Sequence, residues 1–226
     1  ICSASPELFF SLKDNELEMR PMKGTRKRGR YLSEDLRYKR ELGSSEKDRA
    51  ENLMILDMVR NDLGRICIPG SIKTSKLFDI QKLPTVWQQT SSVTGKTDAS
   101  LAEIFSATFP CASVTGAPKT KSMEIISKLE MTARGVYTGT LGYVKPNREA
   151  SFNVAIRTMV VDKLAHRASY GVGGGIVWDS NAESEWEESL LKAQVLEFPT
   201  ESFELFETIK YDPQEGVCLL EEHISR

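Results

Sequence analysis

Two pairs of carboxylates have a type and spacing suited to chemistry. Asp48 and Glu51 stand three residues apart in a segment of helical pattern, and Glu185 and Glu188 repeat this spacing in a later one. The spacing puts both members of a pair on one helix face. Magnesium prefers hard oxygen ligands, often one or two carboxylates with water and substrate oxygens, so two such helices would suit it. Solvated acidic faces near helix N-termini are the other interpretation that the spacing allows.

Three basic side chains could hold or attack an anionic ligand. Lys23 stands in the string PMKGT, where a tight turn could hold its amine toward a cavity, and an uncharged amine is a nucleophile. Arg157 lies within an apolar strand pattern, where a lone charge is costly unless it is paired. A buried ion pair and a bound carboxylate both remain open, because a guanidinium matches a carboxylate with two hydrogen bonds. Lys192 shares the helix face of Glu185 and Glu188.

Two segments rich in small residues could bring the backbone close to a ligand. Gly173, Gly174 and Gly175 interrupt a strand pattern, which indicates either close approach of a ligand or a bulge without one. The string SVTGAPK, residues 113–119, leads from a loop into a helix and could present backbone N–H groups to an anion, although helix capping would also explain its Ser and Thr. Tyr137, on a predicted neighbouring strand, is of a type that is more often a core aromatic.

The elements that must position these residues alternate between strand and helix patterns. The hydrophobic spacing and the turn residues predict the following order: a hairpin at 8–12 and 17–20; a polar, basic loop at 21–40; a helix from Ser45 to about Gly64, capped by Ser44 or Ser45; two strands within 71–93; a helix at 100–109; a loop at 110–119; a helix at about 119–131; strands at 135–144, 150–162 and 168–179; and a helix at 182–196 capped by Asn181 or Ser184. The last three strands read as an antiparallel meander. The fold class is α+β, with helices packed on a largely antiparallel sheet.

Composition excludes several classes of protein. The 226 residues are 40% hydrophobic and 27% charged, which is typical of a globular chain and not of disorder. No stretch approaches the roughly 20 apolar residues of a membrane span. Because the net charge is −2, the basic run between Lys23 and Arg40 is weak support for nucleic-acid binding, the alternative function it raises. The four cysteines form no CxxC pattern, so we expect a reducing, cytoplasmic location.

Taken in order, eight strings resemble the chorismate-utilising enzymes, a family that includes anthranilate, aminodeoxychorismate, isochorismate and salicylate synthases. The strings are SPELFF, RPMKGTRKRG, KDRAENLMILDMVRNDLGR, FPCASVTGAPK, RGVYTGTLGY, NVAIRT, YGVGGGIVWDS and ESEWEESLLKA. The resemblance implies a two-sheet sandwich with helices packed outside and the active site between the sheets. Residues 1–198 would be the C-terminal larger part of this chorismate-binding domain, with its N-terminal part missing.

The resemblance also implies roles for individual residues. It puts the magnesium ligands at Glu51 and Glu188, with Asp48 and Glu185 close by. The remaining residues would contact the substrate: Arg157 and Lys192 its carboxylates, Tyr137 its enolpyruvyl end, and Thr25, Thr115, Gly116, Gly173, Gly174 and Gly175 the rest of the pocket. Magnesium would bind a ring carboxylate and assist departure of the ring hydroxyl.

Two positions separate the branches of the family. Lys23 stands where anthranilate synthases typically carry Ala, and PMKGT resembles aminodeoxychorismate synthases, in which this lysine adds to the ring before ammonia displaces it. Gln88 stands where anthranilate and salicylate synthases usually carry His. This branch is a transferase that aminates chorismate on the way to para-aminobenzoate and folate, with ammonia from a glutamine amidotransferase subunit. Anthranilate synthase component I and isochorismate synthase are the alternatives, and the base lysine of the latter would lie upstream of Ile1.

The final segment, residues 199–226, resembles a linker and the opening strand and helix of aminodeoxychorismate lyase. That enzyme belongs to the class IV aminotransferases and uses pyridoxal phosphate, and its cofactor lysine would lie beyond Arg226. We therefore expect an internal piece of a bifunctional protein. A family-specific C-terminal extension is the other interpretation.

Overall fold

The computed structural model describes residues 1–83, 86–178, 180–193, 196, 211–212, 214 and 216–217. The chain divides into two compact units, residues 1–193 and 194–226. In the second unit, the short strands β11 (Tyr211–Asp212) and β12 (Gly216–Val217) pair in antiparallel fashion. The predicted helix of the lyase-like segment lies outside the described residues. No described helix has the length and apolar character needed to cross a membrane.

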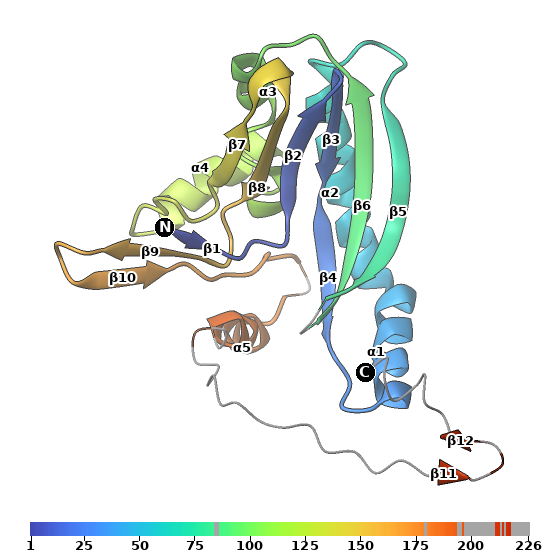
Figure 1. The fold of residues 1–226 in the computed structure, drawn as a ribbon. Helices are drawn as coiled ribbons and strands as arrows, with labels where there is room; N and C mark the ends of the chain where they lie inside the picture. Colours follow the sequence, from blue (N-terminus) through green and yellow to red (C-terminus); the bar gives the residue numbers. More distant parts are fainter. Residues whose placement is uncertain are drawn as a thin grey trace. The chain divides into compact units, whose positions relative to one another are not determined.

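The first unit contains a large antiparallel sheet (Figure 1). Its strands follow the order β4-β6-β3-β2-β8-β7, in which β3 and β4 pair with different parts of β6, and β5 also pairs with β6. The strands are β2 (Leu8–Lys13), β3 (Glu16–Arg20), β4 (Met22–Lys27), β5 (Lys73–Lys82), β6 (Val86–Lys96), β7 (Thr140–Val144) and β8 (Ala150–Val154). The predicted N-terminal hairpin and the two strands within 71–93 are confirmed, and β6 continues to Lys96.

A second, three-stranded sheet contains β1 (Cys2–Ser3), β9 (Thr158–Asp162) and β10 (Arg167–Tyr170) in the order β1-β9-β10. The prediction of one continuous strand over 150–162 is wrong. The chain leaves the large sheet after Val154, passes through Arg157, whose φ is +48°, and enters the small sheet at Thr158. Residues 171–177 are likewise not a strand, and glycines there offer no side chains to stabilise one.

Five helices of the first unit are described, and most begin where the sequence predicts. They are α1 (Leu32–Ser44), α2 (Glu46–Gly64), α3 (Leu101–Thr108), α4 (Lys119–Leu129) and α5 (Ala182–Ala193), with short 3-10 turns η1 (Ala112–Val114) and η2 (Pro146–Arg148). The Ser45 hydroxyl accepts from the Asp48 N–H, and Asn181 accepts from the N–H groups of Glu183 and Ser184. These bonds satisfy N–H groups that have no partner within a helix, which confirms both predicted caps.

The predicted loop at 21–40 is wrong for most of its length, because residues 22–27 form β4 and residues 32–44 form α1, whereas residues 28–31 between them form neither helix nor strand. Residues of β4 pair with β6, from Met22 opposite Thr90 to Lys27 opposite Val86. This pairing joins residues that are 59 to 68 positions apart in the sequence, so no local pattern reveals it. Most polar side chains along 21–40 therefore belong to regular elements.

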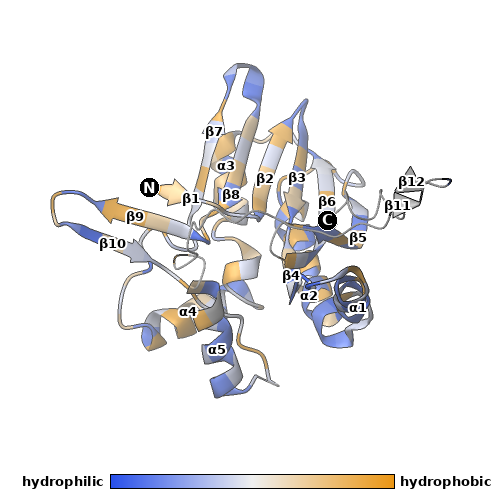
Figure 2. Cartoon of the chain, turned by 60° about the horizontal axis from the view of Figure 1, so that its bottom comes forward, coloured by the Kyte–Doolittle hydropathy of each residue, from blue (hydrophilic) through white to orange (hydrophobic). Residues whose placement is uncertain are grey.

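The core of the first unit lies between the large sheet and helices α2 and α3. It is built from side chains of β2 and β3 with Ile55, Leu56, Val59 and Leu63 of α2, and Figure 2 shows hydrophobic residues along these strands. Phe105 of α3 contacts the rings of Phe10 and Phe152, with centroids 5.2 and 5.0 Å apart. By contrast, no residue of α4 is buried. The core thus fixes α2 and the strands that carry the candidate site.

Candidate active site

Lys23 lies in a β-bulge at the start of β4. Met22 pairs with Thr90 and Thr25 pairs with Gln88. An advance of three residues along β4 therefore lies opposite an advance of two residues along β6. Gly24 supplies the φ of +85° that the extra residue requires. The predicted tight turn is therefore a bulge within a strand, and the side chain of Lys23 is partly buried there.

The glycine segment 173–175 is approached closely by side chains from three parts of the chain. A Cβ atom at Gly175 would lie 3.3 Å from Lys23 Nζ, and one at Gly174 would lie 2.8 Å from Glu185 Oε2. A Cβ atom at Gly173 would lie 3.0 Å from the hydroxyl of Tyr137. The glycines thus leave room for the lysine, the carboxylate and the tyrosine around an exposed backbone.

Lys192 joins α5 to the same segment. Its Nζ donates to the Gly173 carbonyl oxygen at 2.9 Å and lies 2.7 Å from Glu188 Oε1. The Ser180 hydroxyl donates to Glu185 Oε1 at 2.6 Å and accepts from the Val177 N–H. These contacts bring together the predicted residues Lys23, Tyr137, Gly173, Gly174, Gly175, Glu185, Glu188 and Lys192.

Glu7, which the sequence analysis did not single out, also belongs to this region. Its side chain is only 3% exposed, and Oε1 has no hydrogen-bond partner in the described structure. Burial raises the pKa of Glu7 to about 7, although Ser113, the Lys23 charge and the Met22 backbone oppose the rise. Such a carboxyl can give or take a proton near neutral pH. The signal available in the sequence was an acid placed directly before the apolar string LFF.

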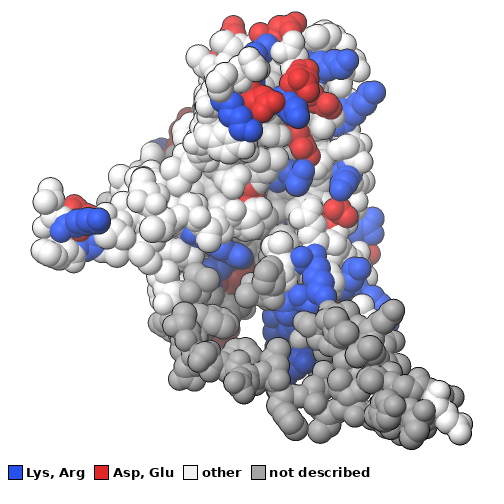
Figure 3. Space-filling view, in the orientation of Figure 1, with Lys and Arg blue, Asp and Glu red and all other residues white. Residues whose placement is uncertain are grey.

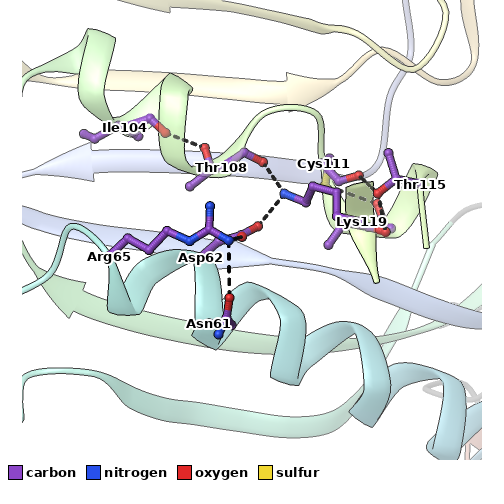
Figure 4. Close-up of polar contacts among 10 residues, drawn as sticks. Asn61, Asp62, Arg65, Ile104, Thr108, Cys111, Thr115 and Lys119 are labelled. Carbon is purple, nitrogen blue, oxygen red and sulfur yellow. Dashed lines mark hydrogen bonds and ion pairs between the residues drawn. The ribbon is translucent and has the colours of Figure 1, made fainter. Parts of the chain in front are cut away.

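A second group of polar contacts anchors the loop that carries Thr115 and Gly116 (Figure 4). Lys119 Nζ donates to Asp62 Oδ2 at 2.5 Å and to the Thr108 carbonyl oxygen at 3.0 Å. The Thr115 hydroxyl donates to the carbonyl oxygens of Cys111 and Ala112. Within the described residues, no hydrogen bond joins Thr115 or Gly116 to Lys23 or to the glycine segment. Their place in the pocket stays a prediction.

Arg157 and two tyrosines add side-chain donors that have no hydrogen-bond partner among the described residues. Arg157 forms no ion pair with any described residue, so the buried salt bridge that the sequence left open is not formed there. Burial raises the pKa of Tyr170, and the positive charge of Arg157 opposes this rise. The Tyr170 hydroxyl is buried and has no hydrogen-bond partner among the described residues. Burial also raises the pKa of the partly buried Tyr137. Both tyrosines are therefore neutral near pH 7 and can donate hydrogen bonds.

The predicted metal ligands are engaged with other groups. Asp48 Oδ2 lies 2.7 Å from Arg26 Nη2, and Glu51 Oε1 lies 4.0 Å from Lys47 Nζ. Glu188 pairs with Lys192 and Glu185 with Ser180, as described above. Among the described residues, no cluster of three or more His, Cys, Asp or Glu side chains could hold a metal ion. The hard oxygens fit magnesium by chemistry, since one or two carboxylates with water suffice, but they are not gathered into a complete ligand set.

The basic run of the sequence lies on β4, on α1 and on the connection between them. Figure 3 shows Lys and Arg side chains gathered over the lower end of β4. Arg26 pairs with Asp48, and Arg28 binds both carboxylate oxygens of Asp35. Ion pairs thus account for part of this run, and the remaining positive charge can attract small anions.

A profile of the chorismate binding enzymes matches residues 1–197. The chain therefore belongs to the chorismate binding enzyme family.

The curated relatives of the chain include members of two branches of that family. It is 46% identical to the chloroplastic aminodeoxychorismate synthase of Arabidopsis thaliana, over 86% of this chain and 21% of the relative. It is 43% identical to anthranilate synthase component 1 of Saccharolobus solfataricus, over 87% of this chain and 47% of the relative. The chain thus spans less than half the length of these curated relatives.

A solved structure confirms the fold class. Anthranilate synthase component I from Streptococcus pneumoniae superposes with a TM-score of 0.76 at 34% identity, over 85% of this chain and 42% of the other. The α+β architecture expected from the resemblance is therefore confirmed. The cytoplasmic location stays a prediction.

Proposed function

We propose that the full-length protein is an aminodeoxychorismate synthase that aminates chorismate to 4-amino-4-deoxychorismate. One observation carries the proposal: the Lys23 amine points from its bulge toward Gly175, in a segment that other polar side chains also approach. An amine so placed is a nucleophile, which the alanine typical of anthranilate synthases is not. Several curated relatives also bear the name aminodeoxychorismate synthase.

The charges and donors of the site suit a dianionic substrate. Arg157 has no described ion-pair partner, and Lys192 presents its ammonium beside the glycine segment. Each can bind one substrate carboxylate. In the proposed complex the Tyr137 hydroxyl donates to the enolpyruvyl group, and Thr25, Thr115 and Gly116 line the rest of the pocket.

The proposed reaction has two substitutions at the ring. First, the uncharged Lys23 amine forms a carbon–nitrogen bond with the ring, while the bond from the ring to its hydroxyl breaks and the hydroxyl accepts a proton and leaves as water. Ammonia then forms its own carbon–nitrogen bond, the bond to Lys23 breaks, and the new ammonium loses a proton. Glu7, with a pKa near 7 and beside the Lys23 charge, can supply and take up these protons. No oxidant or reductant is needed.

We propose that Glu51 and Glu188 hold magnesium, with Asp48 and Glu185 nearby. When bound, the ion would neutralise a ring carboxylate and assist departure of the hydroxyl. The ion pairs of Glu51 with Lys47 and of Glu188 with Lys192 would have to open first. Lys192 would then be free to bind the substrate.

The proposal extends to partners and to the place of the reaction. Ammonia would come from a glutamine amidotransferase subunit or domain, and the product would enter para-aminobenzoate and folate synthesis. Residues 199–226 would begin a lyase domain, which makes the protein bifunctional. Anthranilate synthase component I is the second candidate, because the Saccharolobus relative is 43% identical.

The test uses the full-length protein with chorismate, ammonium and magnesium. We expect Lys23→Ala to abolish formation of aminodeoxychorismate, while Lys27→Ala, an exposed lysine of the same strand, leaves it unchanged. Peptide mass spectrometry of the quenched wild type should find a substrate adduct on Lys23. Accumulation of anthranilate with pyruvate would contradict the proposal in favour of the second candidate, and isochorismate would move the protein to another branch.

A further inference from the structure

Gln88 contacts both residues that follow Lys23. It lies on β6, beside the bulge, and its side chain is 2% exposed. Its Nε2 donates to the Gly24 carbonyl oxygen at 2.7 Å, and its Oε1 accepts from the Thr25 hydroxyl at 2.9 Å. The buried amide of Gln88 thus donates one hydrogen bond to the bulge and accepts another from the residue that follows it.

The bulge needs such a partner because its extra residue is left out of the sheet ladder. A bulge disrupts the local backbone pairing and bends the strand. The Gly24 carbonyl would be costly to leave without a hydrogen bond. Gln88 supplies that bond from a side chain, so it holds the irregular part of β4 against β6.

The opposite side of the bulge is confined by helices. A Cβ atom at Gly24 would lie 2.9 Å from Leu42 Cδ1 and 3.0 Å from Asp48 Cβ. The backbone at Gly24 is therefore packed closely against α1 and the first turn of α2. Held between Gln88 and these helices, the bulge fixes the direction of Lys23 toward Gly175 and its relation to Asp48.

We propose that Gln88 is a positioning residue that fixes the bulge and thereby aims the Lys23 amine; this inference rests on the proposed function of Lys23. Gln88 itself need not touch the substrate. A displacement of about 1 Å in a reacting group can lower a rate by about a hundredfold. Loss of the Gln88 amide should therefore reduce catalysis by Lys23 far more than it reduces substrate binding.

The neighbouring residue is a matched control. Gln89 has the same side chain, lies on the same strand and is 0% exposed. Neither its side-chain nitrogen nor its oxygen has a hydrogen-bond partner among the described residues. Replacement of Gln89 by Met therefore removes no hydrogen bond that holds the bulge, and Met has a similar volume.

The experiment compares Gln88→Met, Gln89→Met and Lys23→Ala in the full-length protein. For Gln88→Met we expect a fall in kcat of about 10- to 100-fold, a KM within about twofold of wild type, and less substrate trapped on Lys23. The thermal midpoint of Gln88→Met should lie below that of Gln89→Met, because the Gly24 carbonyl loses its partner, but Gln88→Met should remain fully folded at the assay temperature. A second readout needs no substrate: the rate at which an amine reagent labels Lys23, followed by peptide mass, should change in Gln88→Met and not in Gln89→Met.

The outcomes separate the two proposals. If Lys23→Ala abolishes turnover while Gln88→Met retains wild-type kcat and labelling, Gln88 has no positioning role. A loss in Gln88→Met that matches its loss of folded protein would also overturn the inference, because it would be structural. If Lys23→Ala retains activity, the proposed nucleophile is wrong, whereas a changed labelling rate in Gln88→Met would still support control of the lysine by Gln88.

Discussion

The ammonium of Lys119 lies 2.5 Å from the Asp62 carboxylate, and their side chains are 18% and 4% exposed. Lys119 is the first residue of α4, and Asp62 lies in the last turn of α2. Lys119 also donates to the Thr108 carbonyl oxygen. Since Thr108 precedes the 109–118 segment and Lys119 follows it, the ion pair with Asp62 holds both ends of this segment close to α2. Thr115 and Gly116 are therefore carried on an anchored loop.

The first prediction concerns this anchor. Lys119→Met should lower the free energy of unfolding by about 3 kcal/mol, because it leaves the buried Asp62 carboxylate without its nearest cation. Lys121→Met is the control, since Lys121 and Glu124 form an exposed pair and such pairs contribute about 1 kcal/mol or less. Urea unfolding of the full-length protein measures both. Equal effects would mean that the Asp62 contact does not stabilise the fold.

A second prediction follows from the buried Glu7 carboxyl. Its folded pKa, about 7, is above the usual value of 4.5, so between these values the folded state holds more protons than the unfolded state. Stability should therefore fall as pH rises from 4.5 to 7, by roughly 3 kcal/mol in all for this group. Glu7→Gln should remove this part of the pH dependence and be more stable than wild type above pH 7.

The control for Glu7 is Glu16→Gln, an exposed position at the start of β3. Chemical unfolding at a series of pH values compares the two variants. Glu7→Gln should also lower kcat in the full-length enzyme, because an amide cannot transfer the proton. A wild-type pH dependence of stability in Glu7→Gln would contradict the assignment of a raised pKa.

A third prediction concerns the carboxylates of α2 and α5. Glu51→Gln and Glu188→Gln should each raise the magnesium concentration needed for half-maximal activity by about tenfold or more, since each removes one charged oxygen ligand. Glu187→Gln, next in sequence to Glu188 and on another side of α5, is the control. Calorimetric titration of the variants with magnesium gives a readout independent of turnover. Unchanged affinity in both variants would show that the ion binds elsewhere.

Much of the fold is encoded in short segments. Ser45 caps α2, Ser100 and Glu103 form a capping box on α3, and Asn181 caps α5. These signals are readable because each acts within one helical turn. The spacing of Asp48 with Glu51, and of Glu185 with Glu188, likewise follows from helix geometry alone.

The relations between distant segments could not be read from local patterns. The strand β4 exists because it pairs with β6. The chain changes sheets between Val154 and Thr158, within a segment whose sequence pattern predicts one continuous strand. The burial of Glu7 also depends on segments that pack over it from elsewhere in the chain.

The sequence by itself determined the α+β class, the caps, the paired carboxylates and the resemblance that the family match confirmed. Tertiary structure alone decided that Lys23 points toward Gly175, that Gln88 hydrogen-bonds to the bulge that carries Lys23, and that Glu7 is buried near Lys23. The physical reason is the distance along the sequence over which each kind of interaction acts. Capping and periodicity act within a few residues, whereas desolvation of a carboxyl and the aim of a side chain depend on long-range strand pairing and on close packing between distant segments.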